Sequence, residues 1–214
     1  MIKAIIFDLD GVIVDTAHYH YLAWKRLANE FNIDLTPDKN ELLKGVSRKE
    51  SLEIILSLGN LKKTDEEKEA LAVRKNGWFV EYVEKMNATE IFTGVKEMIT
   101  TLKQAGYRVA LASSSKNAQT VIVRLGIKNE FDTIVDGTMI THSKPHPEIF
   151  LTAASRLQVN PLECLVFEDA EAGVEAAIRA GMKCVGVGSK KQLGKADVIV
   201  ARTADFNMNL LRTL

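Results

Sequence analysis

Cysteine and long apolar runs are both scarce in this chain of 214 residues. It has two cysteines, Cys164 and Cys184, which excludes a disulfide-rich scaffold and a four-cysteine zinc site. Both lie in apolar runs, so we expect buried free thiols. No apolar run approaches the roughly 20 residues that a membrane span needs, and Asp8 and Asp10 interrupt the first one. We therefore expect no secretion signal, no membrane partner and a reducing cytoplasm as the location.

An excess of charge of one sign is also missing, because 28 lysines and arginines balance 28 aspartates and glutamates. A net charge of zero argues against a protein that coats nucleic acid or an anionic membrane. Hydrophobic residues make up 46% of the chain and charged residues 26%, which is typical of a globular protein and excludes general disorder. We therefore expect a globular protein with no nucleic-acid partner.

Short apolar runs alternate with helical patterns along most of the chain. Residues 2–7 form a β-branched run that indicates a strand buried on both faces, as in parallel sheets. Similar runs follow at 107–112, 133–135, 164–167, 184–187 and 198–200. Apolar spacing predicts helices at 95–105, 117–125, 147–157 and 171–180. This alternation predicts an α/β fold whose core is a Rossmann-like parallel sheet.

A long helical insertion interrupts this alternation between residues 15 and 88. Helical patterns cover 19–31, 39–44, 48–58 and 66–86, and no strand pattern separates them. Thr64, followed by Glu67, fits a capping box for the last of these helices. An insertion of this size is too large for a loop. We expect an all-helical cap domain at 15–88 and an α/β core made of 1–14 and 89–214.

Two carboxylates directly follow the first strand, in residues 8–12 (DLDGV). In open α/β sheets, the reactive site lies at the carboxyl ends of the strands. Asp8 and Asp10 at such an end can bind Mg²⁺, and one of them can attack an electrophile. The alternative is a solvated turn in which Asp and Gly serve the turn geometry, because acidic turns are common.

Three other strand ends carry residues suited to phosphate and metal chemistry. Residues 113–117 (SSSKN) stand at a helix start, where hydroxyls and free backbone N–H groups can cradle a phosphate. Lys144 precedes another helix and can neutralise phosphate charge, while Glu168 and Asp169 offer a second pair of carboxylates. Taken singly, the serines are ordinary helix caps and the lysine is a solvated loop residue. Taken together, the four ends describe one Mg²⁺-assisted phosphoryl-transfer site.

The order of these motifs resembles the haloacid dehalogenase superfamily over essentially the whole chain, including the helical insertion after the first motif. The motifs are Asp8-x-Asp10-Gly, Ser113, Lys144-Pro and Glu168-Asp169-x-x-x-Gly173. The resemblance implies that Asp8 is a nucleophile that forms a phosphoaspartate and that Asp10 is the general acid and base. It also implies Mg²⁺ bound by the carboxylates of Asp8, Glu168 and Asp169 and by the backbone carbonyl of Asp10. An aspartate at the second position favours phosphoryl transfer over dehalogenation, because a leaving sugar oxygen needs a proton.

The insertion and residues 113–117 resemble those superfamily members that interconvert β-glucose 1-phosphate and glucose 6-phosphate through β-glucose 1,6-bisphosphate. Such an enzyme needs two phosphate sites. The resemblance implies Ser113, Ser114 and Lys144 at the transferring phosphate. For the distal phosphate and the sugar it implies Thr16, His20, Gly45, Val46, Arg48, Ser51, Lys75, Ser115, Lys116 and Asn117. It therefore implies a Mg²⁺-dependent phosphomutase that acts on a small sugar phosphate and uses the bisphosphate as its activating intermediate. We expect a monomer.

The residues leave three other functions open. A sugar-phosphate phosphatase would have identical core motifs, and a non-catalytic sugar-phosphate sensor could be built on the same fold. A phosphonate hydrolase needs a lysine that forms a Schiff base, and Lys44 and Lys75 keep this reading open. No pair of histidines has convincing metal-ligand company in the sequence, so no role is assigned to His18, His142 or His146.

Overall fold

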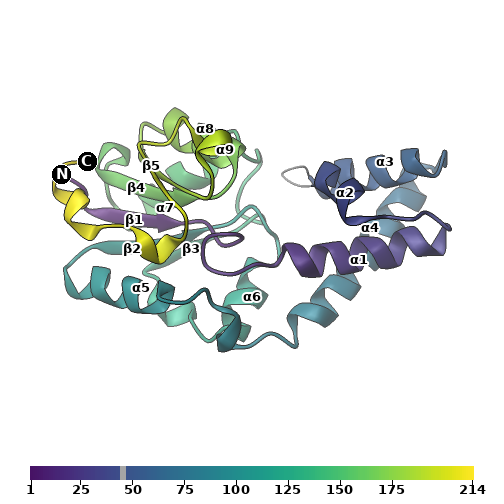
Figure 1. The fold of residues 1–214 in the computed structure, drawn as a ribbon, viewed down its shortest axis with the longest axis horizontal. Helices are drawn as coiled ribbons and strands as arrows, with labels where there is room; N and C mark the ends of the chain where they lie inside the picture. Colours follow the sequence, from purple (N-terminus) through teal and green to yellow (C-terminus); the bar gives the residue numbers. More distant parts are fainter. Residues whose placement is uncertain (44–46) are drawn as a thin grey trace. The chain divides into compact units, whose positions relative to one another are not determined.

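The computed structural model describes residues 1–43 and 47–214 (Figure 1). Within these ranges, six strands form one parallel sheet in the order β3-β2-β1-β4-β5-β6. The strands are β1 (Ala4–Phe7), β2 (Arg108–Ala112), β3 (Thr133–Val135), β4 (Cys164–Glu168), β5 (Lys183–Val187) and β6 (Val198–Val200). This is the doubly wound order, in which the side of the sheet to which successive strands are added switches between β1 and β4. The α/β fold with a parallel sheet predicted from the sequence is confirmed.

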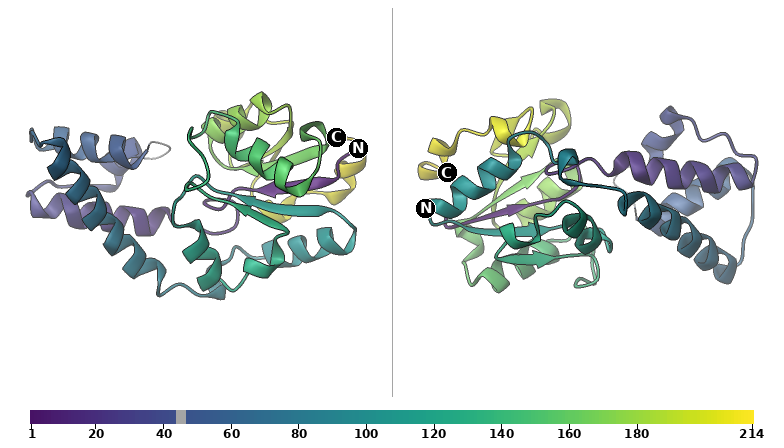
Figure 2. Two further views of the ribbon diagram at one scale, coloured as in Figure 1. Left: turned by 180° about the vertical axis from the view of Figure 1, so that it is seen from behind. Right: turned by 90° about the horizontal axis from the view of Figure 1, so that it is seen from below.

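Helices cover both faces of the sheet (Figure 2). They are α5 (Val95–Gln104), α6 (Ala118–Arg124), α7 (Glu148–Leu157), α8 (Glu171–Arg179) and the short α9 (Lys190–Leu193). On one face, α7 and α8 pack on Ile6, Ala110 and Val166 in a continuous buried cluster. Apart from the first residue of β2 and of β5, the four central strands are buried on both faces, which explains why they appear in the sequence as short apolar runs without alternation. Cys164 and Cys184 belong to this core as free thiols, as expected.

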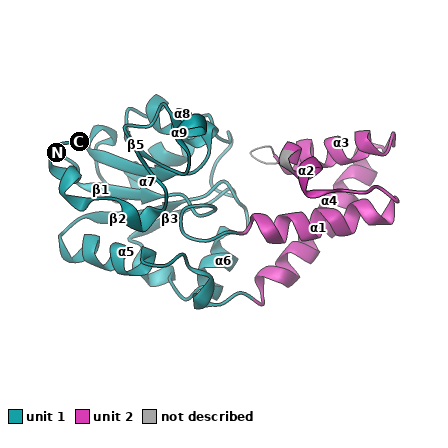
Figure 3. Ribbon diagram, in the orientation of Figure 1, with its two compact units in different colours: residues 1–15, 86–214 teal, residues 16–85 magenta. Residues whose placement is uncertain are grey.

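The chain divides into two compact units, residues 1–15 with 86–214 and residues 16–85 (Figure 3). We call them the sheet unit and the helical unit. The helical unit contains α1 (Ala17–Glu30), α2 (Pro37–Asn40), α3 (Arg48–Leu58) and α4 (Asp65–Val83). Where the chain leaves and re-enters the sheet unit, the two segments are joined by a backbone hydrogen bond of 2.9 Å from Phe92 N to Ile13 O.

Local capping explains where two of these helices begin. Thr64 accepts a hydrogen bond from the amide of Glu67, whose carboxylate accepts one from the amide of Thr64, so the predicted capping box at α4 is confirmed. Ser47 and Glu50 form a second capping box at α3. The helix predicted at 39–44 is wrong in its extent. A single α-helical turn ends at Asn40, the chain tightens into a 3₁₀ turn at Glu41–Leu43, and Lys44 lies outside the described residues.

Membrane-crossing helices are not found in the part of the chain that the structure describes. No helix within residues 1–43 and 47–214 combines the length and the apolar character that a membrane span requires.

Candidate active site

Strand register determines which residues meet at the carboxyl edge of the sheet. Phe7 pairs with Leu111 of β2 and with Phe167 of β4, so β1, β2 and β4 end side by side. The amide of Asp8 donates a hydrogen bond of 2.9 Å to the carbonyl of Phe167, which extends the β1–β4 ladder by one residue. The segments that follow β3, β2 and β1 therefore bring Lys144, Ser113 and Asp8 to this edge, where β4 ends at Glu168.

Three carboxylates gather at the centre of this edge. One oxygen from each of Asp8, Glu168 and Asp169 lies within 4.8 Å of the others. Asp8 and Glu168 are buried, whereas Asp169 is exposed. Asp10 lies in the turn after Asp8, where its backbone forms an isolated bridge with Val14. A set of hard oxygen donors with one exposed side is the arrangement that Mg²⁺ prefers.

Lys144 neutralises part of this negative charge. Its Nζ atom lies 2.5 Å from Oδ1 of Asp8 and 2.8 Å from Oε2 of Glu168. Burial alone would lower the pKa of Lys144, but the charges of Asp8 and Glu168 outweigh it and raise that pKa. The side chain is therefore an ammonium at neutral pH, fixed beside Asp8. Such a group can also neutralise the charge of a phosphoryl group that approaches Asp8.

One lysine does not balance the carboxylates. Burial raises the pKa of Glu168 to about 7, and the charge of Asp8 acts in the same direction. Asp169 is exposed as a residue, but partial burial of its carboxylate raises its pKa to about 8, and the charges of Asp8, Glu168 and Asp10 act in the same direction. Carboxylates that resist ionisation in this way gain stability from a cation placed among them. The residues present therefore fit a divalent magnesium ion.

Two glycines, Gly11 and Gly173, lack side chains where the carboxylates of Asp169 and Glu168 lie. A Cβ atom on Gly173 would lie 2.1 Å from Oε2 of Glu168, and a Cβ atom on Gly11 would lie 2.0 Å from Oδ2 of Asp169. Gly11 also has a positive φ of 74°, a backbone conformation that side chains disfavour. Both positions therefore require glycine, one because of space and the other because of space and backbone conformation.

The segment after β2 is built from two successive serine turns. The amide of Ser115 donates to Oγ of Ser113, and the amide of Asn117 donates to Oγ of Ser115, both at 3.2 Å. Ser113 is buried, whereas Ser114 and Lys116 are exposed ahead of α6. The exposed residues Ser114 and Lys116 therefore alternate with residues that the two turns hold in place.

In the helical unit, a second polar cluster joins α1 and α4. The Nζ atom of Lys75 lies 2.8 Å from Nδ1 of His20, and the His20 ring stacks on Phe79 with centroids 4.0 Å apart. Lys75 is 1% exposed and its Nζ lies 4.5 Å from the centroid of the Trp24 ring. Burial, helped by the charge of Arg48, lowers the pKa of Lys75 to about 7. Burial also lowers the pKa of His20 well below its usual value.

Arg48 begins α3 and extends this cluster. Its Nη2 atom donates a hydrogen bond of 2.8 Å to Oδ1 of Asn76, and its charge acts on both His20 and Lys75. Burial lowers the pKa of Arg48, which still remains a guanidinium cation. Thr16 and Ser51 are both buried in this unit, whereas Gly45 and Val46 lie outside the described residues.

One group of potential metal ligands was not foreseen. His142, His146 and Glu148 lie together where the loop after β3 meets the first turn of α7. Sequence analysis identified no third metal ligand for these histidines, because the sequence does not show that the loop folds back onto Glu148. The pattern H-x₃-H-x-E was the available signal.

Comparison with known proteins agrees with this arrangement. The family model for haloacid dehalogenase-like hydrolases matches residues 5–187. The chain is 46% identical to β-phosphoglucomutase of Bacillus subtilis (strain 168) over 98% of this chain and 93% of that protein. It is 33% identical to a phosphorylated carbohydrates phosphatase of Thermotoga maritima over 91% of this chain and 89% of that protein. A crystal structure of β-phosphoglucomutase from Clostridium difficile has a TM-score of 0.91 and 43% identity, and the match covers 100% of this chain and 96% of that one. The chain therefore belongs to the haloacid dehalogenase-like hydrolase family, as the order of its motifs predicted.

Proposed function

We infer that this chain is a phosphomutase that interconverts β-glucose 1-phosphate and glucose 6-phosphate. One geometric observation supports phosphoryl transfer, namely the carboxylate of Asp8 held by Lys144 beside Glu168 and Asp169. Mutase activity is favoured by the full-length similarity to two β-phosphoglucomutases, at 46% and 43% identity. We propose β-glucose 1,6-bisphosphate as the activating intermediate.

The proposed chemistry has two half-reactions. In the first, Asp8 attacks phosphorus, the bond from phosphorus to the sugar oxygen breaks, and Asp10 gives that oxygen a proton. In the second, Asp10 removes the proton from a sugar hydroxyl, whose oxygen attacks the phosphoryl group on Asp8, and the bond from phosphorus to Asp8 breaks to restore its carboxylate. Bound Mg²⁺ would neutralise charge on the transferring group. Asp8, Glu168 and Asp169 would hold it with their carboxylates and Asp10 with its backbone carbonyl.

We propose that Ser113, Ser114 and Lys144 bind the transferring phosphoryl group. The hydroxyl of Ser113 and the backbone N–H of Ser114 would donate hydrogen bonds to its oxygens. The ammonium of Lys144 would shift from balancing Asp8 and Glu168 alone to balancing the phosphoryl charge as well. Asp8 would thereby keep its charge partner through the reaction.

We propose that the helical unit acts as a cap domain, with boundaries near residues 15 and 88, and that it binds the distal phosphate. Arg48 suits this role because its planar guanidinium can bind phosphate through two hydrogen bonds. Ser115, Lys116 and Asn117 would supply the remaining contacts from the sheet unit, which we expect to comprise residues 1–14 and 89–214. Thr16, His20 and Lys75 would position Asp10 and the sugar hydroxyls, and Gly45, Val46 and Ser51 would line the sugar site. Closure by this binding would exclude water from the phosphoaspartate.

A sugar-phosphate phosphatase is the second candidate, favoured by the similarity at 33% identity to the phosphatase of Thermotoga maritima. The deciding experiment supplies β-glucose 1-phosphate, Mg²⁺ and a trace of glucose 1,6-bisphosphate, and follows glucose 6-phosphate and free phosphate in the same tube. Rapid glucose 6-phosphate with little free phosphate is the result expected of a mutase. Free phosphate without glucose 6-phosphate would establish the phosphatase. The absence of both products would favour a non-catalytic sensor.

The quaternary state and location stay predictions. We propose a monomer, which size-exclusion chromatography with light scattering would test. We propose a cytoplasmic location because Cys164 and Cys184 are buried free thiols, which suit a reducing compartment.

A further inference from the structure

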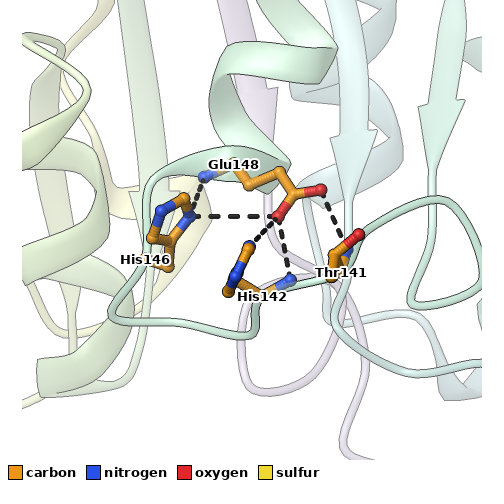
Figure 4. Close-up of polar contacts among 4 residues, drawn as sticks. All are labelled: Thr141, His142, His146 and Glu148. Carbon is orange, nitrogen blue, oxygen red and sulfur yellow. Dashed lines mark hydrogen bonds and ion pairs between the residues drawn. The ribbon is translucent and has the colours of Figure 1, made fainter.

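A second group of metal-ligand side chains lies on the loop between β3 and α7 (Figure 4). Ligand atoms from His142, His146 and Glu148 all lie within 4.8 Å of one another. Oε2 of Glu148 is the shared partner, 2.9 Å from Nδ1 of His142 and 3.9 Å from Nδ1 of His146. The centroids of the two imidazole rings lie 4.5 Å apart, and the ring planes are inclined at 34° to each other. Glu148 is therefore the common contact of both histidines.

These separations match those of ligands around a small metal ion. Zinc lies about 2.0–2.2 Å from nitrogen and oxygen ligands, so two ligand atoms at a tetrahedral angle lie about 3.3–3.5 Å apart. The 2.9 Å separation is a hydrogen bond between Nδ1 of His142 and Oε2 of Glu148, which a metal ion would replace, and the 3.9 Å separation lies slightly above this value. The two histidine ligand atoms also lie within 4.8 Å of each other, so we expect side-chain rotations to bring all three atoms into coordination.

The carboxylate of Glu148 is held in place for this role. Its Oε1 accepts a hydrogen bond from the amide of Thr141 and its Oε2 accepts one from the amide of His142, both at 2.8 Å. These backbone hydrogen bonds lower the pKa of Glu148 to about 2, so the group is an anion at neutral pH. Hydrogen bonds of this kind orient metal ligands and increase their affinity.

The histidines are accessible and suitably disposed. Nδ1 of His146 accepts a hydrogen bond of 3.3 Å from the amide of Glu148, so this nitrogen carries a lone pair rather than a proton. A metal ion would replace this long hydrogen bond. The side chains of His142 and His146 are 62% and 50% exposed, and His146 and Glu148 line a cavity of about 480 Å³. Solvent can therefore supply both the ion and the water ligands that complete its coordination.

We propose that His142, His146 and Glu148 form a binding site for a divalent transition-metal ion such as Zn²⁺, Cu²⁺ or Ni²⁺. Two imidazole nitrogens and one carboxylate favour this class of ion over Mg²⁺, which prefers oxygen ligands. By contrast, the carboxylates of Asp8, Glu168 and Asp169 offer only oxygen ligands, which suit Mg²⁺. The chain thus carries two cation sites of different chemical selectivity.

The test uses the full chain in saturating Mg²⁺, with Zn²⁺ as the probe. Histidine ¹⁵N resonances are recorded during the titration, together with the heat of binding. The resonances of His142 and His146 should shift, while those of His18 remain in place. His142→Asn and His146→Asn should each weaken Zn²⁺ binding at least about tenfold.

His18→Asn is the matched control, because His18 is also exposed and is not part of a candidate ligand group. It should bind Zn²⁺ as the unaltered chain does. Because the resonances are measured on the unaltered chain, the result does not depend on how the variants fold. Zn²⁺ that leaves the His142 and His146 resonances unmoved would overturn the proposal. The same conclusion would follow if a variant that combines His142→Asn and His146→Asn bound Zn²⁺ with unchanged affinity.

Discussion

Lys75 and His20 form a buried pair in which an amine nitrogen lies 2.8 Å from an imidazole nitrogen. Burial is the main cause of the lowered pKa on both side chains, and the charge of Lys75 also lowers that of His20. With its pKa at about 7, Lys75 changes charge near neutral pH, and His20 is a neutral acceptor there. The helical unit therefore contains a lysine whose charge responds to small changes in its surroundings.

This pair predicts a specific pH dependence of stability. In the unfolded chain the lysine pKa is 10.5, whereas in the fold it is about 7. Below pH 7 the side chain is charged in both states, and the fold bears a desolvation cost of roughly 5 kcal/mol. As the pH rises from 7 to 10.5 this cost disappears, because the folded form needs no proton. Lys75→Met should therefore be more stable than the unaltered chain at pH 6, with a difference that shrinks toward pH 10.

Urea unfolding at pH 6, 8 and 10 measures this difference. Lys62→Met is the control, because Lys62 is an exposed lysine of the same unit. Its effect on the free energy of unfolding should stay within about 0.5 kcal/mol at every pH. A stability difference for Lys75→Met that does not change with pH would show that Lys75 keeps its proton in the fold.

Replacement of the nucleophile should abolish both reactions. Asp8→Asn keeps the size of the side chain but removes the attacking carboxylate, so glucose 6-phosphate formation and phosphate release should both fall by at least about 10³-fold. Both products are measured in the assay described above. Turnover near that of the unaltered enzyme would rule out a phosphoaspartate on Asp8.

The tight contact at Gly173 makes a prediction about metal affinity. In Gly173→Ala the new methyl group would overlap the Glu168 carboxylate, which must move. Mg²⁺ affinity, measured by calorimetry, should fall at least about tenfold. Gly77→Ala is the matched control, because nothing lies within 4 Å of a Cβ atom there. That exposed position within α4 should gain about 0.5–1 kcal/mol of stability from alanine and leave Mg²⁺ binding unchanged. Equal Mg²⁺ affinity in both variants would show that Glu168 is not a ligand of the metal.

The distal-phosphate role of Arg48 predicts a selective defect. Arg48→Ala should reduce mutase turnover at least about 10²-fold while Mg²⁺ affinity stays within about twofold, because Mg²⁺ would bind in the sheet unit. Arg48→Lys should restore only part of the turnover, since an ammonium cannot bind phosphate through a planar fork. Arg74→Ala tests an exposed arginine paired with Glu30 and should behave as the unaltered enzyme. Parallel loss of turnover and Mg²⁺ affinity would contradict the assignment.

The sheet and the grouping of its polar residues could be predicted from the sequence. Asp8, Ser113 and Glu168 each stand at the end of an apolar run, and parallel strands place such ends along one edge. The residues alone placed Lys144 at a strand end before a helix, and the resemblance implied that it binds the transferring phosphate. Its contact with Asp8 depends on how the loop after β3 folds, and sequence spacing does not determine this.

Contacts within the helical unit were less predictable. The resemblance identified His20 and Lys75, but the burial of Lys75 against Trp24 depends on how α1 and α4 pack. The same limit applies to His142 and Glu148, which are six residues apart but meet through a turn of irregular backbone. The roles assigned to the site residues stay predictions until the variants are measured.

The hydrogen bond between Phe92 and Ile13 has a consequence for how such enzymes diversify. It joins the two ends of the insertion within the sheet unit, so the segment between them could be replaced as one unit. A different segment could be joined at the same two points without altering the register of β1 or the position of Asp8. Natural recombination, or a deliberate graft from a relative, could therefore change which sugar phosphate is selected while the phosphoryl-transfer chemistry is inherited intact.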